Sequence, residues 1–198
     1  KSWSTTNLSV RVGLLHQLHD ALMDNQEPLA QLLTAEQGKP LFEARGEIAI
    51  GAAYIRWFAE EIRRAKGEIV PAPMADRRLL VTRHPVGVVA AITPWNFPSS
   101  MLARKLGPAL AAGCTVVCKP ANETPLSAYA FVELAARAGV PAGVINMVSG
   151  ITREIGAEMT SNPIVRQLAF TGPTQSGKLL LKQCEDTVKR TSMELGGK

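Results

Sequence analysis

A regular alternation of short β-branched runs with helical segments begins at Val86 and constrains the fold more than any other feature of this sequence. The runs cover residues 86–92, 114–118, 144–148 and 165–170. The helical segments between and after them cover residues 100–111, 125–138, 153–160 and 175–184. This spacing is typical of crossover connections, which place parallel strands side by side and cover both faces of the sheet. The pattern predicts a doubly wound, Rossmann-like α/β domain.

The part of the chain before this alternation has a helical pattern. Apolar residues recur at helical spacing from Val10 to Leu22, and a second run ends at Gly38. A third run covers residues 40–66 and places basic residues in its last turn, as the helix dipole prefers. Residues 67–85 are rich in glycine and proline, and we expect them to form a hairpin that protrudes from a main domain of residues 1–66 and 86–198.

The formal net charge of +5 raises the question of nucleic-acid binding. The basic pairs are scattered, acidic residues lie close to most of them, and no basic stripe carries interleaved aromatic residues. A solvated surface is therefore favoured over a nucleic-acid partner.

The cysteine content indicates a reducing compartment. Cys114 and Cys118 lie on one expected strand, which separates their Cα atoms by about 13 Å, whereas a disulfide needs less than about 7 Å. We therefore interpret the cysteines as buried apolar residues. The sequence shows no signal peptide and no run long enough to cross a bilayer, so we expect no membrane partner and a cytoplasmic protein. An organelle stays open, because the natural N-terminus need not be Lys1.

Ligands of doubly wound sheets bind at the carboxyl ends of the strands, so the loops after these strands are the candidate sites. The loop after Phe170 has the Gly-x-x-x-x-Gly-Lys spacing of a P-loop between Gly172 and Lys178. The next residue is Leu179, where a P-loop needs a hydroxyl for magnesium, and no apolar strand ends in an aspartate. A P-loop nucleotidase is therefore disfavoured, and no metal site is predicted. The turn into a helix could bind a phosphate, or it could be purely structural.

Three further strand ends carry polar side chains. Asn96 lies between two prolines and could donate its amide to a developing oxyanion, or it could satisfy loop carbonyls. Lys119 could meet nucleotide hydroxyls or phosphate, or it could be an ordinary surface lysine. Glu194 precedes a Gly-Gly turn and could act as a general base or have a structural role. Thr124, which precedes Pro125, is expected to cap the next helix.

Four segments taken together are far more specific than any one of them. In chain order they read Pro-Trp-Asn-Phe-Pro, Lys-Pro-Ala-x-x-Thr-Pro, Phe-Thr-Gly-x-Thr-x-x-Gly and Glu-Leu-Gly-Gly-Lys. This order resembles the aldehyde dehydrogenase superfamily, and the segments around Gly38-Lys39-Pro40, Arg104-Lys105 and Gly143 resemble it as well. The resemblance covers essentially the whole chain and is greatest to the succinate-semialdehyde dehydrogenases.

The resemblance implies roles for individual residues. Asn96 would be the side-chain donor of the oxyanion hole, Glu194 the general base, and Arg104 the residue that holds a substrate carboxylate, unless it merely solvates a helix face. Lys119 would bind the adenosine ribose or its 2′-phosphate. The residues implied around the cofactor are Ile92, Thr93, Pro94, Trp95, Lys119, Asn122, Gly156, Phe170, Gly172, Pro173, Gly177, Leu195 and Gly196. Residues 67–85 match the family's oligomerisation hairpin, which implies a homodimer or homotetramer.

Two residues depart from the family pattern. Pro173 replaces a serine that is usual in the family, and Asn122 replaces the acidic residue that binds the ribose in many NAD-preferring members. The expected cofactor is therefore NADP or NAD.

The nucleophilic cysteine of the family lies beyond the Glu-Leu-Gly-Gly motif and thus past Lys198, so we expect the catalytic domain to be absent from this chain. The expected function is part of an enzyme that oxidises a small aldehyde, succinate semialdehyde, through a cysteine thioester. We expect the 198 residues alone to be inactive. The alternatives are a nucleotide-binding fragment with no activity of its own and a dehydrogenase for another aldehyde.

Overall fold

The computed structural model describes residues 2–196, so Gly197 and Lys198, which end the Glu-Leu-Gly-Gly-Lys motif, lie outside the described residues. The central sheet is parallel and has the strand order β5-β4-β3-β6-β7. Its strands are β3 (Val88–Ile92), β4 (Thr115–Lys119), β5 (Ile145–Met147), β6 (Val165–Gly172) and β7 (Arg190–Leu195). The predicted α/β class with a parallel sheet is confirmed.

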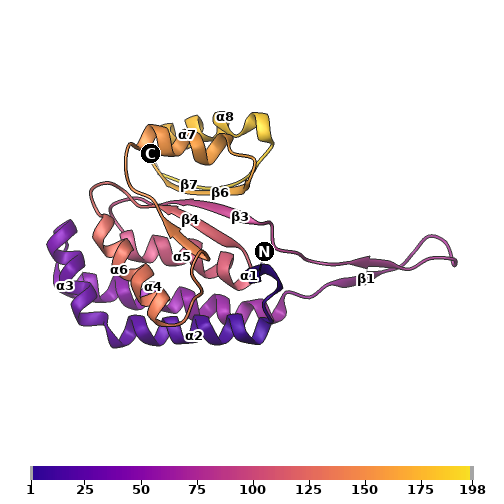
Figure 1. Cartoon of the computed structure of the whole chain (residues 1–198), viewed down its shortest axis with the longest axis horizontal. Coiled ribbons are helices and arrows are strands. Elements are labelled where there is room, and N and C mark those ends of the chain that lie inside the picture. The colour runs from indigo at the N-terminus through magenta and orange to yellow at the C-terminus, as the bar shows by residue number, and fades with distance from the viewer. Residues whose placement is uncertain (1, 197–198) are drawn as a thin grey trace.

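Helices cover both faces of this sheet (Figure 1). The larger helical layer consists of α1 (Ser2–Thr5), α2 (Leu8–Asp24), α3 (Gln26–Gln37), α4 (Leu41–Glu61), α5 (Pro98–Ala112) and α6 (Pro125–Arg137). The opposite face carries α7 (Thr152–Ser161) and α8 (Thr174–Gln183). The arrangement is the doubly wound one that the alternation of the sequence predicts.

Alternate residues of β3 explain why its sequence is apolar throughout. Val89 and Ala91 belong to the core shared with the larger helical layer, whereas Ala90 belongs to the core under α7 and α8. In β6, Leu168 and Phe170 lie in this second core. Because both faces of the strand are buried, an alternating polar pattern is excluded and a continuous β-branched run results.

The end of α4 differs from the prediction. The α-helix ends at Glu61 and is followed by a 3₁₀ turn, Ile62–Arg64, so the predicted helix to residue 66 with a basic last turn is wrong. Arg63 and Arg64 pair instead with the carboxylates of Glu60 and Glu61, at 3.6 and 2.5 Å. The basic side chains thus interact with neighbouring side chains on the exposed end of the helix.

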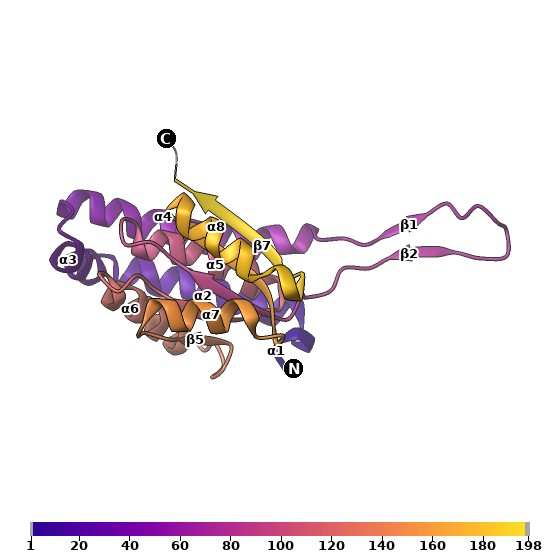
Figure 2. The same ribbon diagram turned by 90° about the horizontal axis from the view of Figure 1, so that it is seen from above.

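The predicted hairpin is confirmed as a protrusion. Strands β1 (Glu68–Val70) and β2 (Leu79–Val81) pair in antiparallel register and extend well away from the sheet (Figures 1 and 2). Ile69 and Leu80 lie opposite each other, and they are 80% and 67% exposed. Such apolar exposure is typical of a surface that another chain covers.

Candidate active site

Strands β3 and β6 lie side by side, and the chain leaves them toward opposite edges of the sheet. From β3 it continues through α5 to β4, and from β6 it continues through α8 to β7 on the other side of the sheet. The helices of these two connections lie on opposite faces (Figure 1). The loops therefore diverge between β3 and β6, and this divergence is where doubly wound sheets leave a crevice for a ligand.

A cleft of about 660 Å³ opens at this divergence, with walls from β3, β4, α7, β6 and α8. Ten of the thirteen residues predicted for the cofactor line it, namely Ile92, Thr93, Pro94, Trp95, Lys119, Asn122, Gly156, Phe170, Gly172 and Pro173. Thr152, Arg153 and Gln183 also line the cleft. Sequence reasoning missed these three because they lie within or at the start of helices, where no motif marks them.

Lys119 is fixed by its own loop. Its buried ammonium donates to the carbonyl of Pro120 and to Oδ1 of Asn122, both at 2.9 Å. The amide of Asn122 donates in turn to the hydroxyl of Thr152, at 3.3 Å. Burial lowers the pKa of Lys119 below its ordinary value. An ammonium has three N–H donors, so one remains for a ligand in the cleft.

Thr93 contributes an unsatisfied polar atom to the cleft wall. Its side chain is buried, and among residues 2–196 its hydroxyl has no hydrogen-bond partner. Buried polar atoms normally find partners, because leaving one unpaired is costly. A polar group of a ligand in the cleft would supply the partner.

The three other residues predicted for the cofactor form a packed junction beside the cleft. A Cβ on Gly177 would lie 2.3 Å from a methyl carbon of Leu195, so the glycine lets α8 approach the end of β7. Gly196 donates its N–H to the carbonyl of Gly172, at 3.2 Å. This junction holds the first turn of α8 at the edge of the cleft.

A charged network lies on the α5 face of β6 and β7. Arg104 pairs with Oε1 of Glu194 at 2.9 Å, and the Thr171 hydroxyl donates to Oε2 at 3.0 Å. The ammonium of Lys105 donates to the same hydroxyl at 2.7 Å. A second hollow of about 240 Å³ is lined by Arg104, Lys105 and Glu194. The structure thus brings the predicted general base and the predicted substrate ligand into direct contact.

Thr171 and Lys105 are functional candidates that the sequence reasoning missed. Thr171 lines the large cleft and also contacts the charged network, so it connects the two hollows. Burial lowers the pKa of Lys105 to about 8, while the nearby carboxylate of Glu194 opposes this shift. The Phe-Thr-Gly and Arg-Lys motifs contained both residues, but only the strand register places Thr171 opposite Glu194.

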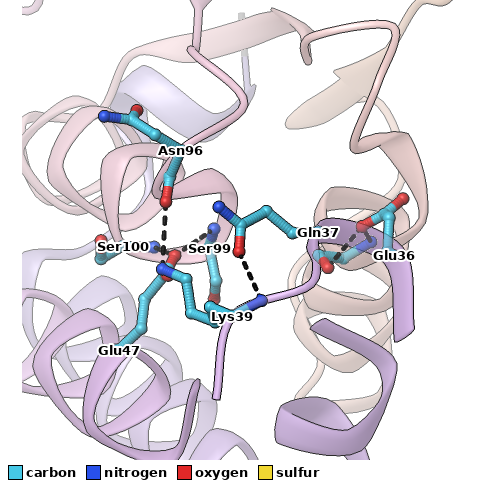
Figure 3. A network of polar contacts seen from close by, with 8 residues as sticks. Glu36, Gln37, Lys39, Glu47, Asn96, Ser99 and Ser100 are labelled. Carbon is cyan, nitrogen blue, oxygen red and sulfur yellow. Dashed lines mark hydrogen bonds and ion pairs between the residues drawn. The ribbon is translucent and has the colours of Figure 1, made fainter. Parts of the chain in front are cut away.

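Asn96 lies on the loop between β3 and α5, outside the wall of the large cleft. Its backbone carbonyl accepts a hydrogen bond from Lys39, at 3.0 Å. Its side-chain amide points away from this contact (Figure 3). The loop is therefore held through the backbone carbonyl of Asn96 and not through its side chain.

The expected start of α6 at Pro125 is confirmed, but the cap by the Thr124 hydroxyl is not formed. Thr124 occupies the N-cap position, but its buried hydroxyl has no partner among the described residues. The N–H groups of Leu126 and Ser127, in the first turn of α6, donate to the carboxylate of Glu36 instead. A charged acceptor from α3 has replaced the local hydroxyl.

None of the three cysteines has the environment of a nucleophile. All are buried free thiols, and burial raises the pKa of Cys118 to about 12 and that of Cys184 above its ordinary value. A reactive thiolate needs the opposite shift. Within residues 2–196 there is no cluster of three or more metal-ligating side chains, and no helix long and apolar enough to span a bilayer.

The parallel sheet and the cleft at its divergence define a doubly wound α/β protein of the Rossmann-like class. The comparison with protein families is more specific, because the model of the aldehyde dehydrogenase family matches residues 1–198. The chain belongs to the aldehyde dehydrogenase family.

Several characterised proteins are similar to this chain. It is 55% identical to a 3-sulfolactaldehyde dehydrogenase of Pseudomonas putida and 54% identical to an NADP-dependent succinate-semialdehyde dehydrogenase of Escherichia coli, over 100% and 99% of its length. A crystal structure of an NADP-dependent enzyme of E. coli superposes with a TM-score of 0.98 at 54% identity, over 99% of this chain and 41% of that one. The chain spans about 40% of the length of the curated relatives it matches.

Proposed function

We propose that residues 1–66 and 86–198 form the cofactor-binding part of an NAD(P)-dependent aldehyde dehydrogenase, whose complete chain oxidises an aldehyde to its carboxylate. The observation that carries this proposal is the cleft between β3 and β6, with its ten expected cofactor residues. The unpaired hydroxyl of Thr93 supports a polar ligand in this cleft.

NADP and NAD both suit the charges of the cleft. The first turn of α8 offers N–H groups to a pyrophosphate, and Lys119 offers an ammonium to the adenosine ribose or its 2′-phosphate. Asn122 places no negative charge beside this ammonium. Arg153 and Glu123 also line the cleft, and the Glu123 carboxylate interacts electrostatically with the Lys119 ammonium. The bound cofactor supplies the hydride acceptor.

The residues of this chain would assist a thiolate that lies outside it. The amide of Asn96 would donate to the oxyanion that forms when the thiolate attacks the aldehyde. Glu194 would accept the proton of the water that hydrolyses the thioester. Because Arg104 and Thr171 hold this carboxylate, a substrate that attracts Arg104 would release Oε1 of the base, while Thr171 would keep Oε2 in place.

Succinate semialdehyde is the substrate that we propose. A guanidinium binds a carboxylate through two parallel hydrogen bonds, and Arg104 borders the smaller hollow. The similar relatives are named for 3-sulfolactaldehyde, succinate semialdehyde and glutarate semialdehyde, each of which carries an acid group besides its aldehyde. Another acid-bearing aldehyde or an aliphatic aldehyde is the alternative.

We further propose that residues 67–85 associate copies of the complete enzyme into a homodimer or homotetramer. The exposed apolar residues of the hairpin support this role. The proposed location is the cytoplasm. An organelle is the alternative, since a similar plant relative is described as mitochondrial.

The test compares the complete enzyme with the 198-residue chain. The complete enzyme should reduce NADP or NAD in the presence of succinate semialdehyde. The isolated chain should bind the cofactor in a calorimetric titration but show no aldehyde-dependent reduction. Turnover by the isolated chain would contradict the assignment of the nucleophile, and absence of cofactor binding in both proteins would contradict the assignment of the cleft.

A further inference from the structure

Two helices of the larger helical layer, α5 and α6, follow loops of the candidate site and begin without a side-chain cap of their own. α5 begins at Pro98 and α6 begins at Pro125, and neither N-cap residue bonds the first N–H groups. Ser99 and Ser100, in the first turn of α5, are buried. Their N–H groups cannot rely on bulk water, so they need partners from elsewhere in the molecule.

Two carboxylates from the N-terminal helical layer accept these hydrogen bonds, one at the start of α5 and one at the start of α6 (Figure 3). Oε1 of Glu47, in α4, accepts hydrogen bonds from the backbone N–H groups of Ser99 and Ser100 at 2.9 and 3.1 Å. Glu36, in α3, accepts from the first turn of α6, including the N–H of Ser127 at 2.9 Å. A negative charge at a helix N-terminus also interacts favourably with the helix dipole.

Lys39 couples the cap of α5 to the loop that carries Asn96. Its ammonium pairs with Oε2 of Glu47 at 2.5 Å and donates to the carbonyl of Asn96 at 3.0 Å. It also lies 4.0 Å from the centre of the Phe97 ring. The side chains of Lys39 and Glu47 are only 7% and 1% exposed. A buried pair of this kind is costly to break from either side.

We propose that Lys39 and Glu47 are positioning residues for the oxyanion donor Asn96, an inference that rests on the proposed function. Lys39 fixes the carbonyl of Asn96, and Glu47 fixes the N–H groups three and four residues later. The backbone is thereby held on both sides of the donor, whose amide points away from the pair (Figure 3). Such preorganisation matters because an oxyanion donor acts only where its hydrogen lies close to the developing charge.

The first experiment is a double-mutant cycle in the complete enzyme. Lys39→Met should lower kcat for succinate semialdehyde between about tenfold and about a hundredfold, with little change in the KM of NADP or NAD. In an Asn96→Ala background the same substitution should have almost no further effect on kcat, since the donor that it misplaces is already gone. A merely structural role would lower kcat equally in both backgrounds.

Glu36→Gln provides a matched control. Glu36 caps α6 in the way that Glu47 caps α5, but it has no contact with the Asn96 loop among its described hydrogen bonds. Its effect on kcat should therefore multiply with that of Asn96→Ala instead of disappearing. Where Lys39→Met leaves too little folded protein, the double variant Lys39→Met/Glu47→Gln removes both charges and keeps an oxygen acceptor for Ser99 and Ser100.

Two results would overturn the proposal. One is a folded Lys39→Met enzyme with unchanged kcat, and the other is an equal loss of kcat with and without Asn96. A complete enzyme that oxidises no aldehyde would instead refute the proposed function. The positioning claim would then be decided by amide hydrogen exchange of the 198-residue chain, where Lys39→Met should accelerate exchange at residues 96–100 and unchanged exchange would refute it.

Discussion

At the scale of single residues, Asn122 is the neutral partner of the Lys119 ammonium in the large cleft. A carboxylate in place of Asn122 would lie within hydrogen-bond reach of the ammonium, as the amide now does at 2.9 Å. It would neutralise Lys119 and repel a 2′-phosphate. Asn122→Glu should therefore lower kcat/KM for NADP at least about tenfold, equivalent to about 1.4 kcal/mol, and spare NAD.

The neutral variant Asn122→Gln is the control and should retain the cofactor preference of the unmodified enzyme. Kinetics of the complete enzyme with both cofactors measure the change. Strict NAD dependence of the unmodified enzyme would contradict the argument, because the cleft would then reject the 2′-phosphate without any carboxylate at this position.

Arg104 is expected to determine the KM for aldehydes that carry an acid group. Arg104→Ala removes the guanidinium that borders the smaller hollow, so the KM for succinate semialdehyde should rise about tenfold or more, while the KM for butanal should be spared. Because Arg104 also pairs with Glu194, any change in kcat should be shared by both aldehydes, and the ratio of the two KM values is the readout. Arg104→Lys keeps the charge without the bidentate geometry and should give an intermediate KM. Equal losses on both aldehydes would indicate a structural role, such as the packing of Arg104 on the Tyr54 ring.

Lys105 should make the stability of the chain depend on alkaline pH. Its folded pKa is about 8 and its ordinary value is 10.5, because burial disfavours the charged form. Between these values the unfolded chain binds a proton that the folded chain lacks, so this group makes the free energy of unfolding rise with pH.

Lys105→Met abolishes that rise, which amounts to no more than about 3 kcal/mol. The difference in unfolding free energy, variant minus unmodified chain, should therefore fall between pH 8 and pH 10 in urea titrations. The other titrating groups cancel in this difference. A difference that stays constant with pH would show that Lys105 keeps an ordinary pKa.

At the scale of elements, two glycines test how closely α4 and α5 pack. A Cβ on Gly107 would lie 2.9 Å from the Phe58 ring, whereas a Cβ on Gly51 would meet its neighbours at 3.5 Å or more. Both glycines are helical, so the gain in helix propensity on substitution by alanine cancels in the comparison. Gly107→Ala should therefore be less stable than Gly51→Ala by about 1–3 kcal/mol. Thermal or urea unfolding of the chain measures this, and equal stability would contradict the packing argument.

The elements that could be predicted from the sequence are those whose cause is local. β3 and β4 are continuous apolar runs because both faces of each strand are buried, and this periodicity is visible in a short window. The rule that ligands bind at carboxyl ends then located the loops around Thr93 and Lys119. The predicted roles of these residues in binding a cofactor stay predictions.

The features that could not be predicted depend on contacts between distant segments. Thr124 was expected to cap α6, but the acceptor is Glu36, which lies 91 residues before Ser127. The contact of Glu194 with Thr171 follows from the register of β6 and β7, which no local pattern reveals. The helix predicted over residues 40–66 extends past the observed end at Glu61. Basic residues suit the end of an α-helix and the end of a 3₁₀ turn equally well, so they do not distinguish the two.

At the scale of the whole molecule, the hairpin exposes an apolar face, to which we assign the contact between copies of the enzyme. Ile69→Lys/Leu80→Lys places two cations on its apolar face and should shift the complete enzyme toward smaller assemblies. Light scattering after size exclusion measures the mass. Val10→Lys, at an exposed apolar position of α2, is the control and should leave the mass unchanged. An unchanged mass of the hairpin variant would contradict the proposed oligomerisation role.

The remote caps from Glu36 and Glu47 have a consequence for how the molecule is made and reused. Ribosomes release α3 and α4 before α5 and α6, so both acceptors already exist when the two proline-started helices emerge. The sheet and its loops are consequently not expected to keep their structure when they are separated from α3 and α4. A chimera that transplants residues 86–196 into another scaffold would lose the anchors of both loops, and the minimal unit for such grafting has to include the segment from Glu36 to Glu47.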